Sequence, residues 1–472
     1  MTAFDKAQQN DTPPVSITDE DVTAEDFLVL SPDRVRLVAE ALDANDSNGV
    51  FDVVRTLNNA DTADLIEHLS GDHRNGLIDL LHGSLNPEVL AELDETVREQ
   101  VVKRLDAEEV AAAISGLESD DALEVIEDLH EDIQQQILQE IPTEERVILE
   151  DSLSYPEESA GRLMQRKLVS VPEHWTVGEI IDFLRSEKDL PQDFYDIFIV
   201  DPKHQPVGSV PLSRVLRSER SVRGPDIMET RIKPVEANMD QEEVARLFRR
   251  HNLISAPVID PEKRLIGVIT VDDVVDVIDE EAGEDIMRLG GVKEEDFYSA
   301  FIDTTRSRFT WLLVNLATAF LASFVIFQFE STISKVVALA VLMPIVASMG
   351  GNAGTQTLTV AVRALAMKEL NPANLWRSIG KEFLVSLVNG LLFAGITGLV
   401  CWWWFDWPEI GFIIAAAMII NIVVAGLSGM GVPLILERLN IDPAIASGTF
   451  LTTITDVVGF LSFLGLAAWF LL

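Results

Sequence analysis

The chain contains few cysteines and histidines, and its sequence lacks recognisable catalytic motifs. Its 472 residues include one cysteine, Cys401, so no intrachain disulfide framework can form. All seven histidines precede residue 252, and with no cysteine cluster this disfavours a soft-metal site in the last third of the chain. We find neither a nucleophile–base constellation nor a phosphate-binding glycine loop, and we therefore expect no enzymatic activity.

Positive charge is also scarce, and charge is unequally divided. Before Phe309 the chain has 69 Asp and Glu but 30 Lys and Arg, whereas after it the numbers are 8 and 6. The first part therefore looks soluble and acidic, and the last third looks membrane-embedded. This density of carboxylates argues against nucleic acid or anionic lipid as a partner. It fits cation binding, although a solvated, self-repelling surface would have the same composition.

The first 28 residues are polar and acidic and lack the apolar run of a signal peptide. We expect them to form a disordered tail, and we expect the N-terminal part to stay in the cytoplasm.

Between residues 29 and 165, short amphipathic segments alternate with polar breaks. Leu, Val and Ile recur at three- and four-residue steps in segments such as DTADLIEHL and DALEVIEDL, as one-sided helices require. These two segments look like copies of one unit with Asp at the N-cap. Serial helix pairs of this kind predict an all-α superhelical domain over 29–165. An ordinary helical bundle fits the same pattern.

A β-rich pattern follows, and it repeats. IVDP at Ile199–Pro202 and GSV at Gly208–Val210 recur as VIDP at Val258–Pro261 and GVI at Gly267–Ile269, each shifted by 59 residues. We expect two strands around each Asp-Pro turn and then a helix. This order resembles a tandem CBS-domain pair over 166–282, an α/β regulatory module. CBS pairs often dimerise and bind adenosine nucleotides or metals.

Acidic residues concentrate after the second copy. Four fall within six positions: Glu280, Glu281, Glu284 and Asp285. On a helix the last three share one face, where like charges repel. A solvated helix face is the ordinary explanation, but the position between a regulatory module and a membrane domain also favours a cation site. We expect a connecting helix over 283–308.

The last third contains five apolar segments of about membrane-spanning length, each ~20 residues or more. They lie at 309–329, 336–365, 383–405, 411–436 and 444–472, which predicts a five-helix α transmembrane domain over 309–472. Most flanking Lys and Arg lie on the side of the N-terminus. The positive-inside rule therefore places the N-terminus in the cytoplasm and the C-terminus outside.

The stretch Leu342–Thr357 is unusual inside an apolar segment. It contains a proline, three glycines and four polar residues: Pro344, Gly350, Gly351, Gly354, Asn352, Thr355, Gln356 and Thr357. Broken, polar backbone at membrane depth is tolerated only where it is buried in protein or lines a water-filled path. A helix–helix contact made by small residues is an equal alternative.

Asp456 lies well inside the fifth apolar segment. A charge at the centre of a span costs about 2.5–3.5 kcal/mol, and such residues normally mark an ion or proton path. At helical spacing it shares a polar stripe with Thr449, Thr452 and Thr453. The second segment carries a matching stripe: Asn352, Thr355, Gln356, Thr359 and Arg363. The alternative is a buried carboxylate held by hydrogen bonds from nearby Thr and Asn residues.

These ligands are of the oxygen type, which favours a hard cation such as Mg²⁺. Mg²⁺ sheds its water reluctantly, so a wide path with one carboxylate per chain can hold it partly hydrated. A dimer would bring two such carboxylates together.

Domain order and membrane motifs together resemble the MgtE family of magnesium channels and transporters. The motifs are SMGGNAGTQ at Ser348–Gln356, Asp442-Pro443-Ala444 with Ser447, and TTITD ending in Asp456. The resemblance implies a homodimer with the ion path at the subunit interface, lined by the second and fifth spans. With the polar stripes, it gives these expected path residues: Asp456, Asn352, Gly351, Gly354, Gln356, Thr355, Thr452, Thr453 and Asn421.

The resemblance also implies regulatory Mg²⁺ sites among the cytoplasmic acids. Local matches give these metal ligands, beside Asp456 in the membrane: Asp240, Glu242, Asp273, Glu281, Glu284, Asp285 and Asp442. The N-terminal domain contributes Asp120 or Asp121 by a loose alignment. Two residues depart from the family pattern: Asn252 stands where an acid is expected, and Thr449 where Pro is usual.

We therefore expect a Mg²⁺-selective channel or transporter for uptake across the plasma membrane, closed when cytoplasmic Mg²⁺ bridges the acidic sites. An ion-coupled carrier and a CBS-based membrane sensor without transport are the alternatives. The expected partners are a second copy of the chain, membrane lipid and divalent cations, but not nucleic acid. Mg²⁺ is expected as both cargo and regulator, and ATP is a further candidate ligand of the CBS pair.

Overall fold

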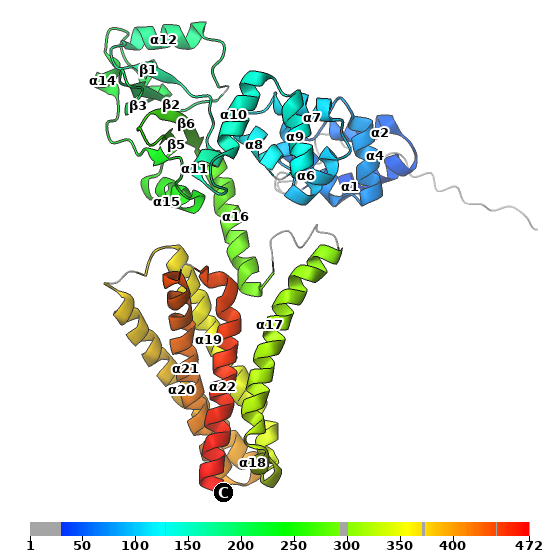
Figure 1. Cartoon of the computed structure of the whole chain (residues 1–472), viewed down its shortest axis with the longest axis vertical. Helices are drawn as coiled ribbons and strands as arrows, with labels where there is room; N and C mark the ends of the chain where they lie inside the picture. Colours follow the sequence, from blue (N-terminus) through cyan, green and yellow to red (C-terminus); the bar gives the residue numbers. More distant parts are fainter. Residues whose placement is uncertain are drawn as a thin grey trace, which may run out of the picture. The chain divides into compact units, whose positions relative to one another are not determined.

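The computed structural model describes residues 30–127, 129–191, 193–292, 301–370, 373–439 and 441–471. They form two compact units, the first ending at Val277 and the second beginning at Ile278 (Figure 1). The predicted disordered tail, 1–28, lies outside the described residues.

Short helices make up the N-terminal part of the first unit and stack side by side in chain order (Figure 1). They are α1 (Pro32–Asp43), α2 (Ser47–Val54), α3 (Asn59–His68), α4 (Gly71–Leu81), α5 (Glu88–Ala91), α6 (Glu95–Val102), α7 (Ala107–Ile114), α8 (Ser119–Glu127), α9 (Glu131–Glu140) and α10 (Thr143–Leu153). Each of these helices contributes at least one buried leucine, valine or isoleucine. The all-α superhelical domain is thus confirmed.

Two buried arginines show how the helical unit repeats. Arg74 on α4 donates to the carbonyls of Ile66 and Leu69, where α3 ends. Arg98 on α6 donates in the same way to the carbonyl of Leu93, after α5. The last carbonyls of a helix have no partner within it, so each arginine satisfies the end of the helix before its own.

The repeated β-rich segments form two sheets of the same design. One has β1 (Ser170–Pro172), β2 (Asp196–Val200) and β3 (Pro206–Pro211), and the other has β4 (Val235–Glu236), β5 (Ser255–Ile259) and β6 (Leu265–Thr270). In each sheet the first two strands are parallel and the last two antiparallel. Four helices accompany them: α12 (Val177–Ser186), α13 (Leu212–Arg217), α14 (Gly224–Ile227) and α15 (Gln241–His251). The tandem CBS pair is confirmed, with β2–β3 and β5–β6 offset by 59 residues as predicted.

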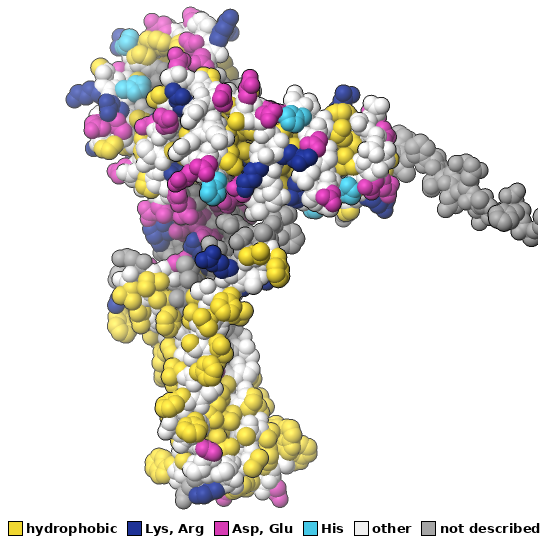
Figure 2. Space-filling view, turned by 45° about the vertical axis from the view of Figure 1, so that its right-hand side comes forward, with side chains coloured by type: hydrophobic (Ala, Val, Ile, Leu, Met, Phe, Trp, Pro, Cys, Tyr) yellow, Lys and Arg dark blue, Asp and Glu magenta, His cyan; other side chains and the backbone are white. Residues whose placement is uncertain are grey.

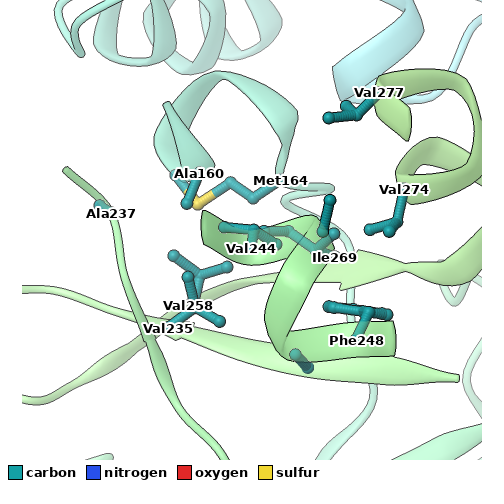
Figure 3. Packing of buried hydrophobic residues seen from close by; sticks show 12 residues of the cluster. Ala160, Met164, Val235, Ala237, Val244, Phe248, Val258, Ile269, Val274 and Val277 are labelled. Atoms are coloured by element: carbon teal, nitrogen blue, oxygen red, sulfur yellow. The ribbon is translucent and has the colours of Figure 1, made fainter. Parts of the chain in front are cut away.

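The segment just before β1, the first strand of the first CBS copy, packs into the second copy. The short helix α11 (Ala160–Leu163) places Ala160 and Met164 in the core with Val244 and Phe248 of α15 (Figure 3). Gln165 exchanges backbone hydrogen bonds with Val268 of β6. The second core therefore contains residues that precede the first sheet.

The helix after β6 is longer than predicted. α16 runs from Val271 to Gly290, so the acids at 280–285 lie on one helix with the end of the second CBS copy. Residues 293–300 lie outside the described residues, and 301–308 form the start of α17 (Phe301–Phe327). In the described residues, the connecting segment 283–308 is thus divided between α16 and α17.

The second unit contains the apolar helices. Besides α17 they are α19 (Ala338–Ala366), α20 (Leu375–Phe405), α21 (Pro408–Arg438) and α22 (Pro443–Leu471), with the short α18 (Glu330–Lys335) between α17 and α19. In the described residues, five helices are long and apolar enough to cross a membrane, as predicted. On the face seen in Figure 2, hydrophobic side chains cover much of these helices.

The unusual stretch 342–357 does not break its helix. α19 continues through Pro344 and the glycines to Ala366. A proline in a helix removes one backbone hydrogen bond, and neighbouring helices make this tolerable in membrane proteins. The stretch therefore differs from an ordinary membrane helix in its polar residues and glycines, and not in an interruption of the helix.

Candidate cation path and acidic sites

Two contacts fix the alignment of α19 with α22. A Cβ at Gly354 of α19 would lie 2.8 Å from the side chain of Leu451 on α22. Four residues earlier, Gly350 contacts the side chain of Asn421, which Gly459 of α22 also contacts. From the first contact to the second, the residue number falls on α19 and rises on α22, so the two helices are antiparallel.

Asp456 lies between the two contacts. Leu451 is five residues before it and Gly459 three residues after it, and the matching interval on α19 is Gly350–Gly354. At equal rise per residue on the two helices, counting from Leu451 places Asp456 level with residue 349, and counting from Gly459 places it level with residue 353. Its level therefore falls within 349–353, the stretch that contains Gly351 and Asn352. The Asp456 side chain is partly exposed rather than enclosed within the single chain.

The predicted polar stripe of α19 lies on a face that the described residues leave uncovered. All five of its side chains are exposed: Asn352, Thr355, Gln356, Thr359 and Arg363. On α22, Thr452 is exposed and Thr453 is partly exposed. The two stripes are thus open to a path or partner beyond one chain, and are not buried in the helix bundle.

The glycines divide between the two roles weighed from the sequence. Gly350 and Gly354 are buried, and a Cβ at either would overlap or crowd a side chain of a neighbouring helix. A Cβ at Gly351 would meet nothing within 4 Å. The helix-contact role therefore fits Gly350 and Gly354, and only Gly351 has the open surroundings that a path residue needs.

Asn421 lies inside the bundle rather than on the open face. Its side chain is fully buried, and its Nδ2 donates to the carbonyl of Val346 over 2.8 Å. In this chain it is therefore not placed to contact an ion in a path along the exposed stripe.

One membrane acid was missed from the sequence. Glu382 on α20 is partly buried and accepts a hydrogen bond of 2.6 Å from the hydroxyl of Thr357 on α19. The signal was a carboxylate within an apolar helix, the same signal that singled out Asp456. Because Lys381 stands next to it, we assigned this region to the connection before the span.

A cluster of acids lies within the first unit where α8 meets the start of α16. We call it the α8–α16 cluster, and its members are Glu118, Asp120, Asp121, Asp272 and Asp273. Asp120 is 8% exposed, and within the described chain neither of its carboxylate oxygens has a hydrogen-bond partner. Asp273 is better placed, since it accepts from the hydroxyl and backbone N–H of Thr270.

Burial and mutual repulsion raise the pKa values in this cluster. Burial, and then the charge of Asp273, raise the pKa of Asp120 well above its usual value. Burial and neighbouring glutamates raise the pKa of Asp121 to about 6. Burial raises the pKa of Asp273 to about 7, with Asp272 adding repulsion. Such shifts mean that the ionised cluster lacks compensating positive charge.

The cluster has the donor chemistry of a hard-cation site without yet having its geometry. Among the residues that the structure describes, no three Asp, Glu, His or Cys side chains are grouped as metal ligands. However, a divalent cation takes carboxylate oxygens as ligands, and Asp120 offers two that are buried and unpartnered. Cation binding would relieve both the repulsion and the unsatisfied oxygens.

A second acidic site lies within the second unit, at the end of α16. Arg288 donates from Nη1 to Oδ2 of Asp442 over 2.6 Å and also pairs with Glu284. Asp442 accepts in turn from the backbone N–H of Ala444 at the start of α22. Burial, and then the charge of Asp442, raise the pKa of Asp285. Predicted ligands Glu284, Asp285 and Asp442 are thus brought together, with an arginine among them.

The end of α16 packs against the membrane helices of its own unit. Leu289 contacts a buried cluster whose members come from α19 and α22: Leu358, Val362, Ala444 and Leu451. Gly291 has φ +70° and lies against the indole of Trp311 on α17, where a Cβ would overlap the ring. The C-terminal turn of α16 is therefore docked at the cytoplasmic ends predicted for these helices.

The remaining predicted residues have structural partners. Asp240 caps α15 by accepting from the backbone N–H of Glu242, and Glu242 is 3.7 Å from Arg246. Asn252, the departure from the family pattern, ends α15 in the left-handed region at φ 51°, which Asn tolerates. Thr449, the other departure, donates to Asn315 of α17 over 2.9 Å.

Family models match three parts of the chain. A model described as "Divalent cation transporter" matches residues 343–466, and "MgtE intracellular N domain" matches 57–158. The CBS-domain model matches 160–221 and 224–280.

Curated relatives are similar over about two thirds of the chain. The "Magnesium transporter MgtE" of Bacillus subtilis (strain 168) is 33% identical over 321 residues, which are 68% of this chain and 71% of that protein. The protein of the same name from Thermus thermophilus is 35% identical over 326 residues, covering 68% and 72%. These relatives are named as transporters rather than enzymes.

Two solved structures are similar to about half of the chain. "Crystal structure of the cytosolic domain of the Mg2+ channel MgtE in complex with ATP" is 30% identical with a TM-score of 0.48, and covers 52% of this chain and 99% of that one. "Crystal structure of the soluble part of a magnesium transporter" is 24% identical with a TM-score of 0.46, covering 53% and 98%.

Proposed function

Because this chain belongs to the MgtE family of magnesium transporters, we propose that it mediates Mg²⁺ uptake as a channel gated by cytoplasmic Mg²⁺. Its path runs along the open face of α19 and α22 and is completed by a second copy of the chain. The single observation that carries this proposal is the position of Asp456. A carboxylate at membrane depth lies level with residues 349–353, the stretch that contains Gly351 and Asn352, beside a polar stripe that one chain leaves exposed.

The exposed stripe supports a homodimer. A membrane helix face lined by Asn, Thr, Gln and Arg is unfavourable against lipid and favourable against water or protein. Two copies related by a two-fold axis would place two such faces and two Asp456 carboxylates around one path. Two carboxylates with amide and hydroxyl oxygens suit a Mg²⁺ ion that keeps several waters.

The two acidic sites support a gate that Mg²⁺ closes. α16 carries Asp272 and Asp273 at its start and Glu284 and Asp285 near its end. At low Mg²⁺ the acids of the α8–α16 cluster repel one another, and so do Asp285 and Asp442. At high Mg²⁺ the ions bridge carboxylates, which uncharged amides cannot do. Bridging favours the state in which Leu289 is docked against α19 and α22, a ligand-driven shift between two states.

Purified protein in vesicles tests the path. With a Mg²⁺ gradient as the only driving force, the wild type should load a Mg²⁺-sensitive dye, and Asp456→Ala should abolish the signal. Asp406→Asn is the matched control, because Asp406 ends α20 away from the stripe in a left-handed conformation that Asn also adopts. Near-normal flux through Asp456→Ala would remove Asp456 from the path. Flux that needs a proton or sodium gradient would favour a coupled carrier, and no flux at all a sensor.

Patch recording tests the gate. The triple variant Glu281→Gln, Glu284→Gln, Asp285→Asn should conduct at millimolar internal Mg²⁺, where the wild type closes. Asp279→Asn, which is exposed on the same helix, should close like the wild type. Wild-type inhibition of the triple variant would contradict gating through these acids.

The N-terminal part lies in the cytoplasm in this proposal, with five spans placing the C-terminus outside the plasma membrane. ATP is a candidate regulatory ligand of the CBS pair, because the 30% identical cytosolic domain was crystallised in complex with ATP. Nucleotide binding is tested by isothermal titration of the full-length protein with ATP, with GTP as the comparison.

A further inference from the structure

Asn421 is the most enclosed polar side chain in the membrane helices for which the structure leaves an atom unsatisfied. It is on α21 and is 0% exposed. Its Oδ1 has no hydrogen-bond partner in the described chain. A buried amide oxygen without a partner costs free energy that an apolar side chain of similar size would avoid. Simple space filling therefore does not explain an asparagine at this position.

The amide lies between two glycines of different helices. On one side is Gly350 of α19, where a Cβ would overlap Nδ2 and approach the carbonyl carbon of the amide. On the other side is Gly459 of α22, where a Cβ would lie 2.8 Å from Nδ2. Only glycine at both positions leaves room for this side chain.

The hydrogen bond of Asn421 reaches the backbone of α19. Nδ2 donates to the carbonyl of Val346 over 2.8 Å, two residues after Pro344 and one turn before Gly350. A proline and closely spaced glycines make a helix less stable and easier to bend. The hydrogen bond from Asn421 of α21 thus adds a fixed point to α19 where that helix is least stable by itself.

This fixed point is close to the residues of the proposed path. Gly459 is three residues from Asp456, and Gly350 is two residues from Asn352. At 1.5 Å of rise per residue, Asp456 and Asn352 each lie within about 5 Å, along the helix axis, of the glycine that contacts Asn421. A sliding of α19 against α22 would change the spacing between their polar stripes directly.

We propose that Asn421 is a positioning residue, whose amide clips Val346–Gly350 of α19 to Gly459 of α22 and so sets the spacing of Asn352 and Asp456 along the path. This inference rests on the proposed transport function. It also replaces the expectation that Asn421 itself lines the path. Ion selectivity depends on the distance between oxygen ligands, so loosening the clip changes which divalent cation passes as well as how much.

The test compares a single variant, which removes the amide, with a double variant, which also adds a methyl group beside the space left behind. Asn421→Ala alone leaves a void between α19 and α22. Asn421→Ala with Gly350→Ala returns a methyl group to the space that the amide occupied, because the three nearest atoms that a Cβ at Gly350 would meet all belong to Asn421. The double variant should therefore be more stable than Asn421→Ala, and keep its dimer content, without recovering the hydrogen bond.

The readouts are Mg²⁺ and Ca²⁺ flux per folded protein, in vesicles of the full-length chain. We expect the double variant to lose at least fivefold in Mg²⁺ flux and to change its Mg²⁺ to Ca²⁺ flux ratio at least threefold. A stable double variant with both values within twofold of the wild type would overturn the inference. A proportional loss of both fluxes would also overturn it, because that is what a role in stability alone produces.

A second variant and two controls cover the case in which the double variant does not fold. If the double variant does not fold, Asn421→Leu fills a similar volume with carbon and is judged by the same flux ratio. Wild type and Asp456→Ala are measured beside them. No flux through the wild type would contradict the proposed function, whereas selective wild-type flux with an unchanged double variant would contradict only the role of Asn421.

Discussion

Arg288 of α16 donates to Asp442, the residue just before α22, over 2.6 Å, and the same guanidinium pairs with Glu284. Both carboxylates were predicted as Mg²⁺ ligands, and a fixed positive charge of the chain already lies between them. An internal cation of this kind stabilises the docked end of α16 whether or not Mg²⁺ is bound.

Arg288→Gln should therefore weaken closure in the absence of Mg²⁺. A partly exposed ion pair contributes up to about 1 kcal/mol, which corresponds to about a fivefold shift toward the open state. Patch recording at zero internal Mg²⁺ should show a larger residual current, while closure at high Mg²⁺ is retained. Arg288→Lys keeps the charge and should stay close to the wild type. A Mg²⁺-free current equal to that of the wild type would show that the pair does not hold the gate.

The α8–α16 cluster should make the first unit less stable as pH rises. An acid whose pKa is raised in the folded state favours folding at low pH, and that stability is lost between its unfolded and folded pKa values. The loss therefore falls between about pH 4 and the folded values of about 6 for Asp121 and about 7 for Asp273. Hydrogen-exchange protection of α8 in the full-length protein, corrected for intrinsic rates, should fall over this range and recover with Mg²⁺.

Asp120→Asn is the sharpest variant of that cluster. An amide keeps the shape of the side chain and removes a buried, repelled charge, so α8 should gain about 1–3 kcal/mol of protection at neutral pH without Mg²⁺. The additional hydrogen-exchange protection of α8 on adding Mg²⁺ should be smaller in this variant than in the wild type. Asp106→Asn, at the residue just before the neighbouring α7, serves as the control. Unaltered Mg²⁺-dependent protection in Asp120→Asn would exclude Asp120 from the cation site.

Gly351→Ala and Gly354→Ala form a matched pair on α19. A methyl group at Gly354 would crowd Leu451 and should cost about 1–3 kcal/mol of stability. A methyl group at Gly351 meets nothing within 4 Å and should leave stability unchanged. If Gly351 faces the path, Gly351→Ala lowers Mg²⁺ flux at normal stability. Thermal unfolding and dye flux measured on the same preparations separate the two effects.

Glu382 offers a test of a carboxylate that the path does not need. Glu382→Gln keeps an acceptor for the hydroxyl of Thr357 and should preserve both stability and flux. Glu382→Ala removes it and should cost about 1–2 kcal/mol, because a hydrogen bond to a charged acceptor is lost between α19 and α20. A large loss of flux in Glu382→Gln at normal stability would instead give its charge a part in conduction.

Sequence alone predicted those features that depend on local pattern. The Asp-Pro turns at Asp201 and Asp260 follow apolar strands at one fixed spacing, so both CBS sheets could be placed in register. The five apolar helices follow from length and composition, and Asp456 stands out because any charge in such a helix does.

Other features depend on which face of a helix meets which neighbour, and the sequence does not contain that directly. Asn421 and Asn352 are both asparagines at membrane depth, yet one is enclosed by two glycines and the other is exposed. Gly350 and Gly351 are adjacent, yet only the first faces a neighbouring helix. The Arg288–Asp442 pair joins residues 154 positions apart, and no local pattern marks it.

The contribution of Ala160 and Met164 to the second CBS core has a consequence for how the chain is threaded. The polypeptide leaves α10, first contributes Ala160 and Met164 to the second core, then builds the first sheet, and finally returns to complete the second copy. Topologically the first sheet is an insertion into the fold of the second copy. A force on the N-terminal helices would thus be transmitted to β6 and α16 through the core that Ala160 and Met164 share with Ile269 and Val274.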